Sequence, residues 1–176
     1  MSATLPVVAN AGPLMVLAKL NVLHLLKQLY GRVHISRSVY DEVVVEGMRH
    51  GHPDASTLHL FLSQMEWQPE DVEPTGIPAD IQAAHLDRGE RDTLGLALAL
   101  GKCLVLIDDT AGRQAARAHG MSVKGSLGIL IEAYRREMVT TDQLRLYFAE
   151  IVRRHDIWIN RALAERLLHE TLGTQR

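Results

Sequence analysis

Residues 103–112, CLVLIDDTAG, decide the fold of this chain. A short apolar run of the kind that forms a buried strand ends abruptly at two carboxylates, Asp108 and Asp109. The following stretch, TAGRQAARAHG, predicts a helix, so the region indicates a strand, a turn and a helix in succession. Ligands of open parallel α/β sheets bind beyond the carboxyl ends of the strands. The two acids therefore mark a candidate functional site.

The same succession recurs along the 176 residues. Apolar runs predict strands over residues 5–10, 32–36, 103–107 and 121–123, with brief edge strands expected over 66–69 and 157–159. Helical patterns cover residues 13–29, 38–48, 58–65, 80–100, 110–120, 124–138, 140–156 and 160–170, with polar loops over 47–57 and 70–80. Unbroken apolar strands that alternate with helices predict a parallel sheet covered on both faces. We therefore expect a single α/β domain over residues 1–176, with a three-layer α/β/α architecture.

The composition excludes several classes of protein. A net charge of −2 gives no support for a polycationic nucleic-acid binder, and two Phe, two Trp and four Tyr are too few for an aromatic stacking platform. The lone cysteine, Cys103, cannot form an internal disulfide and is compatible with a reducing compartment. The first twenty residues lack the basic region of a signal peptide, and no window is apolar enough for a membrane span. We expect a cytoplasmic protein without membrane contact.

Further oxygen-bearing side chains occupy comparable positions elsewhere in the chain. They are Asn10 after the first strand, Asp41 and Glu42 near a helix start, and Glu90 and Asp92 in GERDTLGLALALG. The strand-end rule predicts that these groups converge with the acidic pair. Carboxylates gathered in one cleft repel one another unless a cation lies between them. Hard oxygen ligands favour Mg²⁺ or Mn²⁺, which activates a water for attack on a phosphodiester.

The ordered segments VVANAGPLMVLAKL, SVYDEVV, GERDTLGLALALG and LVLIDDTAGRQAARAHGMSVKGSLGILIEA resemble the PIN domain. The likeness is closest to a subgroup of bacterial and archaeal PIN-like proteins related to toxins of the VapC type. It runs from Val7 to about Glu132, and HDIWINRALAERLLHE is similar to the tail of that subgroup. The resemblance implies a PIN-like fold and a metal-dependent single-strand ribonuclease, often the toxin of a toxin–antitoxin pair. The implied partners are single-stranded RNA, a small antitoxin protein that plugs the cleft, and a second copy of the chain.

Carried over by position, the resemblance places Asn10 where the family has its first Asp. Glu42 falls on the helix carboxylate after the second strand. Either Glu90 or Asp92 supplies the third acid, and either Asp108 or Asp109 supplies the last. The implied metal ligands are Glu42, Glu90, Asp92, Asp108 and Asp109, with Asn10 as a neutral ligand or water-orienting group. The uncharged Asn10 lowers the attraction for a divalent ion by roughly a few kcal/mol, although the subgroup frequently carries Asn there.

Each candidate also has a purely structural explanation. The acids before residue 110 and at the start of GERDTLGLALALG can cap helices, and Asp41 and Glu42 can form a solvated helix face. Arg113 and Arg117 either hold an RNA phosphate or form an exposed helix face. We interpret His50 and His52 as loop residues, because no further zinc ligand lies nearby in the sequence.

Capping residues are expected at two helix starts. Ser38 is the predicted N-cap of helix 38–48, and Gly125 with Ser126 supplies the turn and cap of the helix that follows the last strand.

Two further functions fit parts of the pattern. A PIN-like binding module would keep the fold around a vestigial acidic cleft, and such a protein would bind no metal and cleave no RNA. A small-molecule nucleotide enzyme of another α/β type is disfavoured, because no Gly-rich phosphate loop follows the first strand.

Overall fold

The computed structural model describes residues 5–173, so the first four residues of the stretch examined for a signal peptide lie outside it. The chain divides into two compact units, Met1–Lys124 and Gly125–Arg176. The expectation of a single domain over residues 1–176 stays a prediction.

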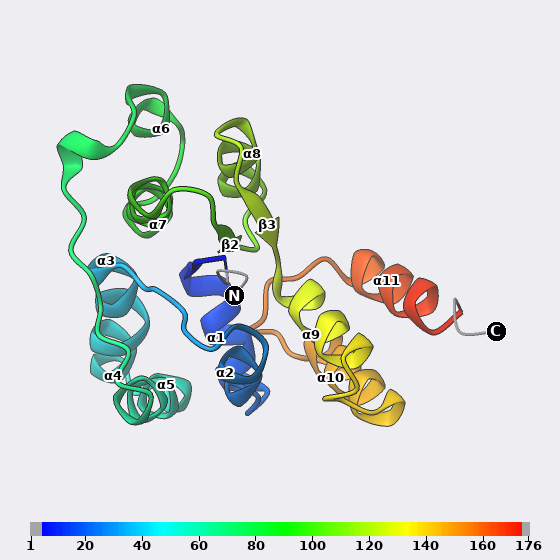
Figure 1. Ribbon diagram of the computed structural model, residues 1–176. Helices are drawn as coiled ribbons and strands as arrows, with labels where there is room; N and C mark the ends of the chain where they lie inside the picture. Colours follow the sequence, from blue (N-terminus) through cyan, green and yellow to red (C-terminus); the bar gives the residue numbers. More distant parts are fainter. Residues whose placement is uncertain (1–4, 174–176) are drawn as a thin grey trace. The chain divides into compact units, whose positions relative to one another are not determined.

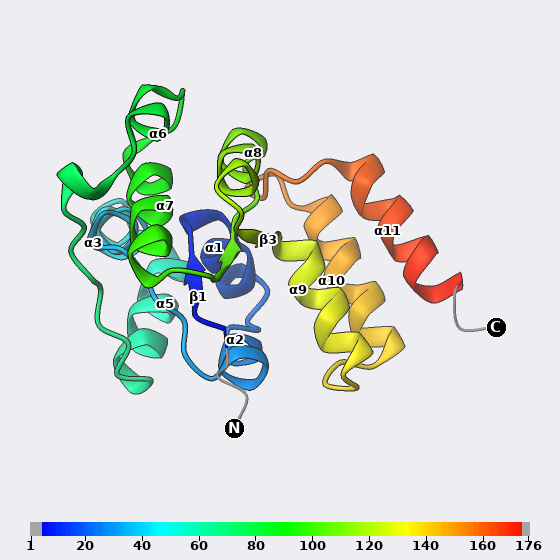
Figure 2. The same ribbon diagram turned by 45° about the horizontal axis from the view of Figure 1, so that its top comes forward.

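A three-stranded parallel sheet forms the centre of the first unit. Its strands are β1 (Val7–Ala9), β2 (Leu104–Leu106) and β3 (Ser122–Lys124), in the order β1-β2-β3. Ala9 pairs with Leu106 and Leu106 pairs with Lys124, so the three carboxyl ends are level. Helices α1 (Ala11–Lys19) and α7 (Arg88–Leu100) lie on opposite sides of β1 (Figure 1, Figure 2). The predicted α/β fold with a helix-flanked parallel sheet is confirmed.

The expected strand over residues 32–36 contacts this sheet through a single bridge instead of a ladder. His34 pairs with Val8, and its backbone N–H donates to Val7 O at 2.7 Å. Ser36 bridges Glu70 in the same way, so the edge strand expected over residues 66–69 is reduced to one paired residue just beyond it. The ladder cannot lengthen because a helix begins at Arg37.

The helix predicted over residues 13–29 is two helices, and that prediction is wrong. The helices are α1 and α2 (His24–Tyr30). Between them Asn21 has a φ of 57°, a left-handed conformation that ends an α-helix. The apolar pattern continues through this break, and for that reason periodicity alone did not reveal it.

Residues 37–49 form one helical run with a wide central turn. The run comprises α3 (Arg37–Tyr40), the π-helical segment η1 (Asp41–Glu46) and α4 (Gly47–Arg49). Its N-cap is Ser36, whose hydroxyl accepts a hydrogen bond from Val39 N–H at 3.4 Å, so the prediction of Ser38 as the cap is wrong. Glu42 consequently lies in the middle of the run and not near its start. π-Helical turns are rare and occur frequently at functional sites.

The rest of the first unit is more helical than predicted. It contains α5 (Pro53–Gln64), η2 (Pro74–Gly76), α6 (Ala79–Ala83), α7 and α8 (Thr110–Ala118). The loop expected over residues 47–57 is largely helical because Pro53 opens α5 at a first-turn position. The helix expected over residues 80–100 divides into α6 and α7, since Asp87 caps a new start. The helix predicted over residues 110–120 is confirmed as α8.

Replacing Gly47 with alanine should destabilise the packing of α4 against α5. A Cβ on Gly47 would lie 2.7 Å from the Cβ of Ala55, and neither atom can move without its backbone. We expect Gly47→Ala to lower the free energy of unfolding by about 1–3 kcal/mol, which outweighs the gain of about 1 kcal/mol in helix propensity. Urea unfolding measures this change. The exchanged pair Gly47→Ala/Ala55→Gly should recover most of the loss, and a Gly47→Ala variant as stable as the wild type would contradict the close packing.

The second unit is helical throughout its described residues. It contains α9 (Ser126–Arg135), α10 (Thr141–Arg153) and α11 (Arg161–Gly173). Helix α10 begins with a capping box between Thr140 and Gln143. Ser126 is the first residue of α9 and Gly125 is its N-cap, so the cap predicted from the Ser126 side chain is wrong.

Residues 157–159 form no strand, so that prediction is wrong as well. A strand needs a pairing edge, and the described part of this unit offers only helices. None of the helices within residues 5–173 is long and apolar enough to cross a membrane.

Candidate functional site

The ends of β1 and β2 bring Asn10 and the acidic pair to one edge of the sheet. Asn10 follows β1 directly, and its backbone N–H donates to Leu106 O at 2.9 Å. Asp108 Oδ2 lies 3.2 Å from the position that a Cβ would take on Gly12, in the first turn of α1. The N-terminus of a helix stabilises a carboxylate at such a position. The two strand ends thus meet as the parallel-sheet rule predicts.

Asp109 caps α8 and also contacts an acid of α7. Its side chain accepts a hydrogen bond from Gly112 N–H at 2.8 Å, as expected for a cap. Its carboxyl group also lies close enough to Glu90, which is only 8% exposed, to contribute to the raised pKa of that acid. Burial is the main cause that raises the pKa of Glu90, and the charges of Asp87 and Asp109 add to it against a lowering hydrogen bond from the Asp87 backbone.

Asp87 is a carboxylate of this region that the sequence analysis missed. As the N-cap of α7 it accepts a hydrogen bond from Glu90 N–H at 2.7 Å, while Glu90 Oε2 accepts one from Asp87 N–H at 2.9 Å. This reciprocal capping box fixes both side chains. The sequence carries the pattern of such a helix start, because an acid stands three residues before Glu90 and an apolar run follows.

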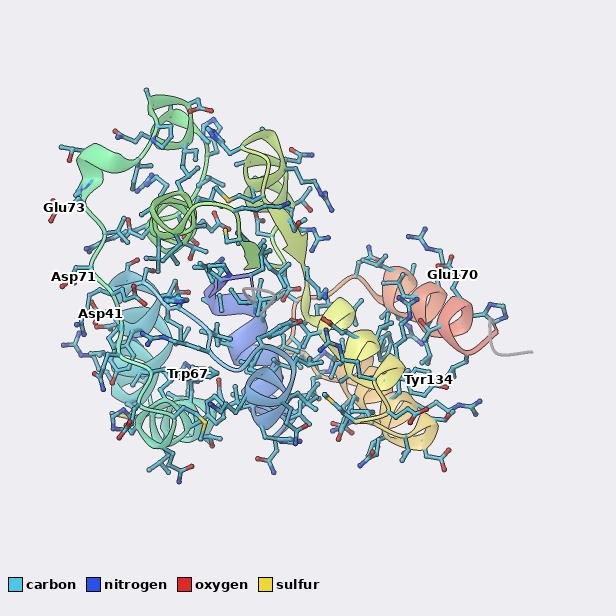
Figure 3. All side chains as sticks on the ribbon, viewed as in Figure 1. Asp41, Trp67, Asp71, Glu73, Tyr134 and Glu170 are labelled. Carbon is cyan, nitrogen blue, oxygen red and sulfur yellow. The ribbon has the colours of Figure 1, made fainter. Side chains whose placement is uncertain are left out.

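Glu42 reaches the same turn of α7 from η1. Its Oε2 lies 3.1 Å from the position of a Cβ on Gly89, and Asp87 Oδ1 lies 3.4 Å from that point. Partial burial of the carboxylate, followed by the charge of Asp87, raises the pKa of Glu42. The neighbouring Asp41 lies on the same helical run (Figure 3) and is less exposed than Glu42. Of the two adjacent acids, Glu42 is the one next to α7.

The two alternatives for the third acid point in different directions. Each residue of an α-helix is rotated by about 100° from the one before it, so the side chains of residues two apart point to nearly opposite sides of the helix. Glu90 contacts Asp87 and Asp109, whereas the carboxylate of Asp92 pairs with Arg88 at 3.7 Å. The structure therefore links Glu90 to the other acids and pairs the half-buried Asp92 with the exposed Arg88.

Arg113 lies beside the end of β2. Its Nη1 donates to Ile107 O at 3.0 Å. Burial and then the charge of Arg117 lower the pKa of Arg113, whereas the nearby Asp108 raises it. The two arginines therefore adjoin each other and the acidic edge, with Arg117 exposed. The rings of His50 and His52 are tilted to each other with centroids 6.3 Å apart, and His50 Nε2 lies 3.8 Å from Glu46 Oε2.

The acids stand as linked neighbours and not as one compact cluster. Within residues 5–173, no group of three or more His, Cys, Asp or Glu side chains is arranged to hold a metal ion. The links run from Glu42 to Asp87, from Asp87 to Glu90 and from Glu90 to Asp109.

Comparison with known protein families covers nearly the whole chain. The PIN domain family matches residues 6–172. The chain belongs to the PIN domain family. No curated protein matches it. PIN domains have a nuclease-type fold, generally use divalent metal ions and commonly bind RNA. The resemblance in the sequence is confirmed for the family, while the toxin-related subgroup stays a prediction.

The donor set of this PIN domain is chemically suited to a hard divalent cation. Carboxylate and amide oxygens are the ligands that Mg²⁺ and Mn²⁺ prefer. Burial, with a smaller contribution from neighbouring negative charges, raises the pKa values of Glu42 and Glu90. A divalent cation would relieve the repulsion between these charges.

Replacing Glu90 with glutamine should stabilise the PIN domain at neutral pH. A glutamate whose pKa is raised by folding contributes stability at low pH and loses it as the pH rises past the ordinary value of about 4.3 through the folded value. Glutamine keeps the capping box and removes the repulsion by Asp87 and Asp109. We expect the melting temperature of Glu90→Gln to exceed that of the wild type increasingly between pH 4 and pH 8. Glu73→Gln, at an exposed acid, is the control, and a constant difference across this range would contradict the assignment.

Proposed function

We propose that this PIN domain is a metal-dependent endoribonuclease that cuts single-stranded RNA. The supporting observation is that Glu90 contacts Asp87 and Asp109 and shares the turn at Gly89 with Glu42, at the edge where β1 and β2 end. Four acids from three separate stretches of chain thus border one end of the sheet. The chemistry that such a group supports is hydrolysis of a phosphodiester with the aid of a cation.

The proposed Mg²⁺ or Mn²⁺ ion would be held by Glu42, Glu90, Asp108 and Asp109, with Asn10 as a neutral ligand or water-orienting group. Asp92 belonged to the expected set, and its pairing with Arg88 favours Glu90 in its place. The bound ion would activate a water and stabilise charge on the phosphate. Because the acids stand as neighbours and not as a ready group of three, side chains must rotate to share an ion.

The arginines beside the acids are proposed to contact the RNA backbone. Arg113 has N–H groups left after its bond to Ile107 O, and a guanidinium presents a planar fork that matches a phosphate. Arg117 extends this positive edge into solvent. The two residues would draw the phosphate toward the carboxylates.

A binding module without catalysis is the second candidate. It is favoured by the uncharged Asn10 at a position where the family has an acid, together with the lack of a preformed three-ligand group among the described residues. Such a protein would keep the acidic edge of the sheet as a docking surface.

The biological setting is proposed from the resemblance to toxin-related proteins. In that setting the protein is a cytoplasmic toxin, a small antitoxin covers the cleft, and two copies of the chain form a dimer. Co-expression with a protein encoded beside it would test the first partner, and sedimentation analysis would test the second.

The nuclease proposal is tested by metal removal. We expect the purified protein to cleave single-stranded RNA with added Mn²⁺, to stop after chelation by EDTA, and to recover when Mn²⁺ is restored in excess. Double-stranded RNA of the same sequence is the control substrate. Cleavage that continues in EDTA would point to a contaminating nuclease, and no cleavage at any Mn²⁺ concentration would favour the binding module.

A further inference from the structure

Thr93 links the end of β1 to the first turn of α7 through a hydroxyl group that is fully buried. Its Oγ1 lies 2.7 Å from Gly89 O and 3.3 Å from Asn10 Oδ1. Thr93 is 0% exposed and Asn10 is 7% exposed. Thr93 is neither one of the acids nor one of the arginines of the site. It contacts Asn10, the candidate residue that stands where the resemblance places an Asp.

The contacts of Thr93 Oγ1 with Gly89 O and with Asn10 Oδ1 compete for a single hydrogen. A hydroxyl group has one hydrogen to donate and two lone pairs to accept with. Gly89 O, at 2.7 Å, is the closer acceptor and takes that hydrogen, whereas 3.3 Å is long for a bond between a hydroxyl and an oxygen. Thr93 Oγ1 therefore presents a lone pair to the Asn10 amide. A lone pair is satisfied by a hydrogen-bond donor and not by the amide oxygen.

The other end of the Asn10 amide faces outward. No described residue accepts a hydrogen bond from Asn10 Nδ2. Since no buried side-chain nitrogen or oxygen in the described part of the chain lacks a partner, this outer end reaches solvent. A half-turn about the Cβ–Cγ bond would exchange the amide oxygen and nitrogen while keeping the same packing.

We propose that Thr93 is a positioning residue that turns the Asn10 amide so that Nδ2 donates to Thr93 Oγ1 and Oδ1 faces outward at the edge of the sheet. This inference rests on the proposed function for its consequence, because an outward oxygen suits a cation whereas an outward NH₂ group suits an anion. It also explains how an amide serves at this position, since a carboxylate could not donate to Thr93.

Hydrogen exchange of the Asn10 side chain tests the orientation directly. The chain has three asparagines, Asn10, Asn21 and Asn160, so selective ¹⁵N labelling gives three side-chain NH₂ signals, of which only that of Asn10 comes from a buried residue. We expect one Asn10 NH₂ hydrogen to exchange about 10-fold or more slowly than those of the two exposed asparagines. The protection should persist in Thr93→Ser, which keeps the hydroxyl, and vanish in Thr93→Val, which has nearly the same shape.

Calorimetric titration of Mn²⁺ into the same variants supplies the second measurement. Removing an outer partner of a metal ligand typically weakens affinity about 10-fold or more, so Thr93→Val should bind Mn²⁺ that much more weakly and Thr93→Ser like the wild type. Fast exchange of both Asn10 hydrogens in the wild type would overturn the proposal, as would protection that survives in Thr93→Val. If the wild type bound no Mn²⁺, the proposed function would fall, while slow exchange would still support the orientation by Thr93.

Discussion

Replacing Asp108 and Asp109 together with asparagine is expected to abolish Mn²⁺ binding and RNA cleavage. At about 4 Å, one carboxylate attracts a divalent cation by roughly 8 kcal/mol at an effective dielectric constant of 20. Even if desolvation cancels two thirds of that attraction, each carboxylate accounts for about 100-fold in Kd. Calorimetry with Mn²⁺ and a cleavage assay on single-stranded RNA measure the two losses.

Asparagine is preferred to alanine at these positions because it removes the negative charge and keeps an oxygen that can cap a helix. The side chain of Asp109 caps α8 through Gly112 N–H, and an alanine there would cost about 1 kcal/mol of stability. In Asp109→Asn the amide oxygen accepts the same hydrogen bond, so the cap is retained while the charge is lost. We expect Asp108→Asn/Asp109→Asn to melt within a few degrees of the wild type. If it still bound Mn²⁺ with wild-type affinity, these two acids would not be ligands.

Asn10→Asp is expected to have the second-largest effect, in the opposite direction. The change adds a carboxylate at the edge where β1 and β2 end, next to the turn that carries Asp108. We expect Mn²⁺ to bind about 10-fold or more tightly, because the added charge attracts the cation directly. Without metal, the variant should be less stable than the wild type, since the inner oxygen of the new carboxylate competes with Gly89 O for the hydrogen of Thr93.

Asn160→Asp is the matched control for this variant. It adds the same charge at an exposed asparagine whose Oδ1 accepts a hydrogen bond from Leu163 N–H, a role that a carboxylate retains. The control should leave Mn²⁺ affinity and cleavage unchanged. Equal Mn²⁺ affinity in Asn10→Asp and the wild type would show that residue 10 does not face a bound cation.

The features of the fold that depend on chemical pattern were predictable from the sequence. Apolar runs located β1, β2 and β3, and the strand-end rule correctly placed Asn10 beside the end of β2. The cap formed by Asp109 was also foreseeable, because an acid before a helix is a common N-cap. These features rest on interactions between residues that are near in sequence or fixed by sheet pairing.

The features that depend on a single backbone conformation were not predictable. The break at Asn21 and the π-helical turn around Glu42 leave the apolar periodicity intact, so no pattern announces them. The choice between Glu90 and Asp92 also needed the structure, because helix geometry shows that they diverge but not which of them faces the sheet edge. Asp87 was not predicted, although an acid three residues before Glu90 is the sequence signal of the capping box that the two residues form.

A crystal structure of the protein grown with Mn²⁺ would locate the bound ion through its anomalous signal. We expect one peak at the edge where β1 and β2 end, with oxygens of Glu42, Glu90 and Asp108 or Asp109 as ligands and the Asn10 oxygen facing it. Saturating Mn²⁺ with no peak at that edge, or a peak bound only by other residues, would contradict the proposed metal site.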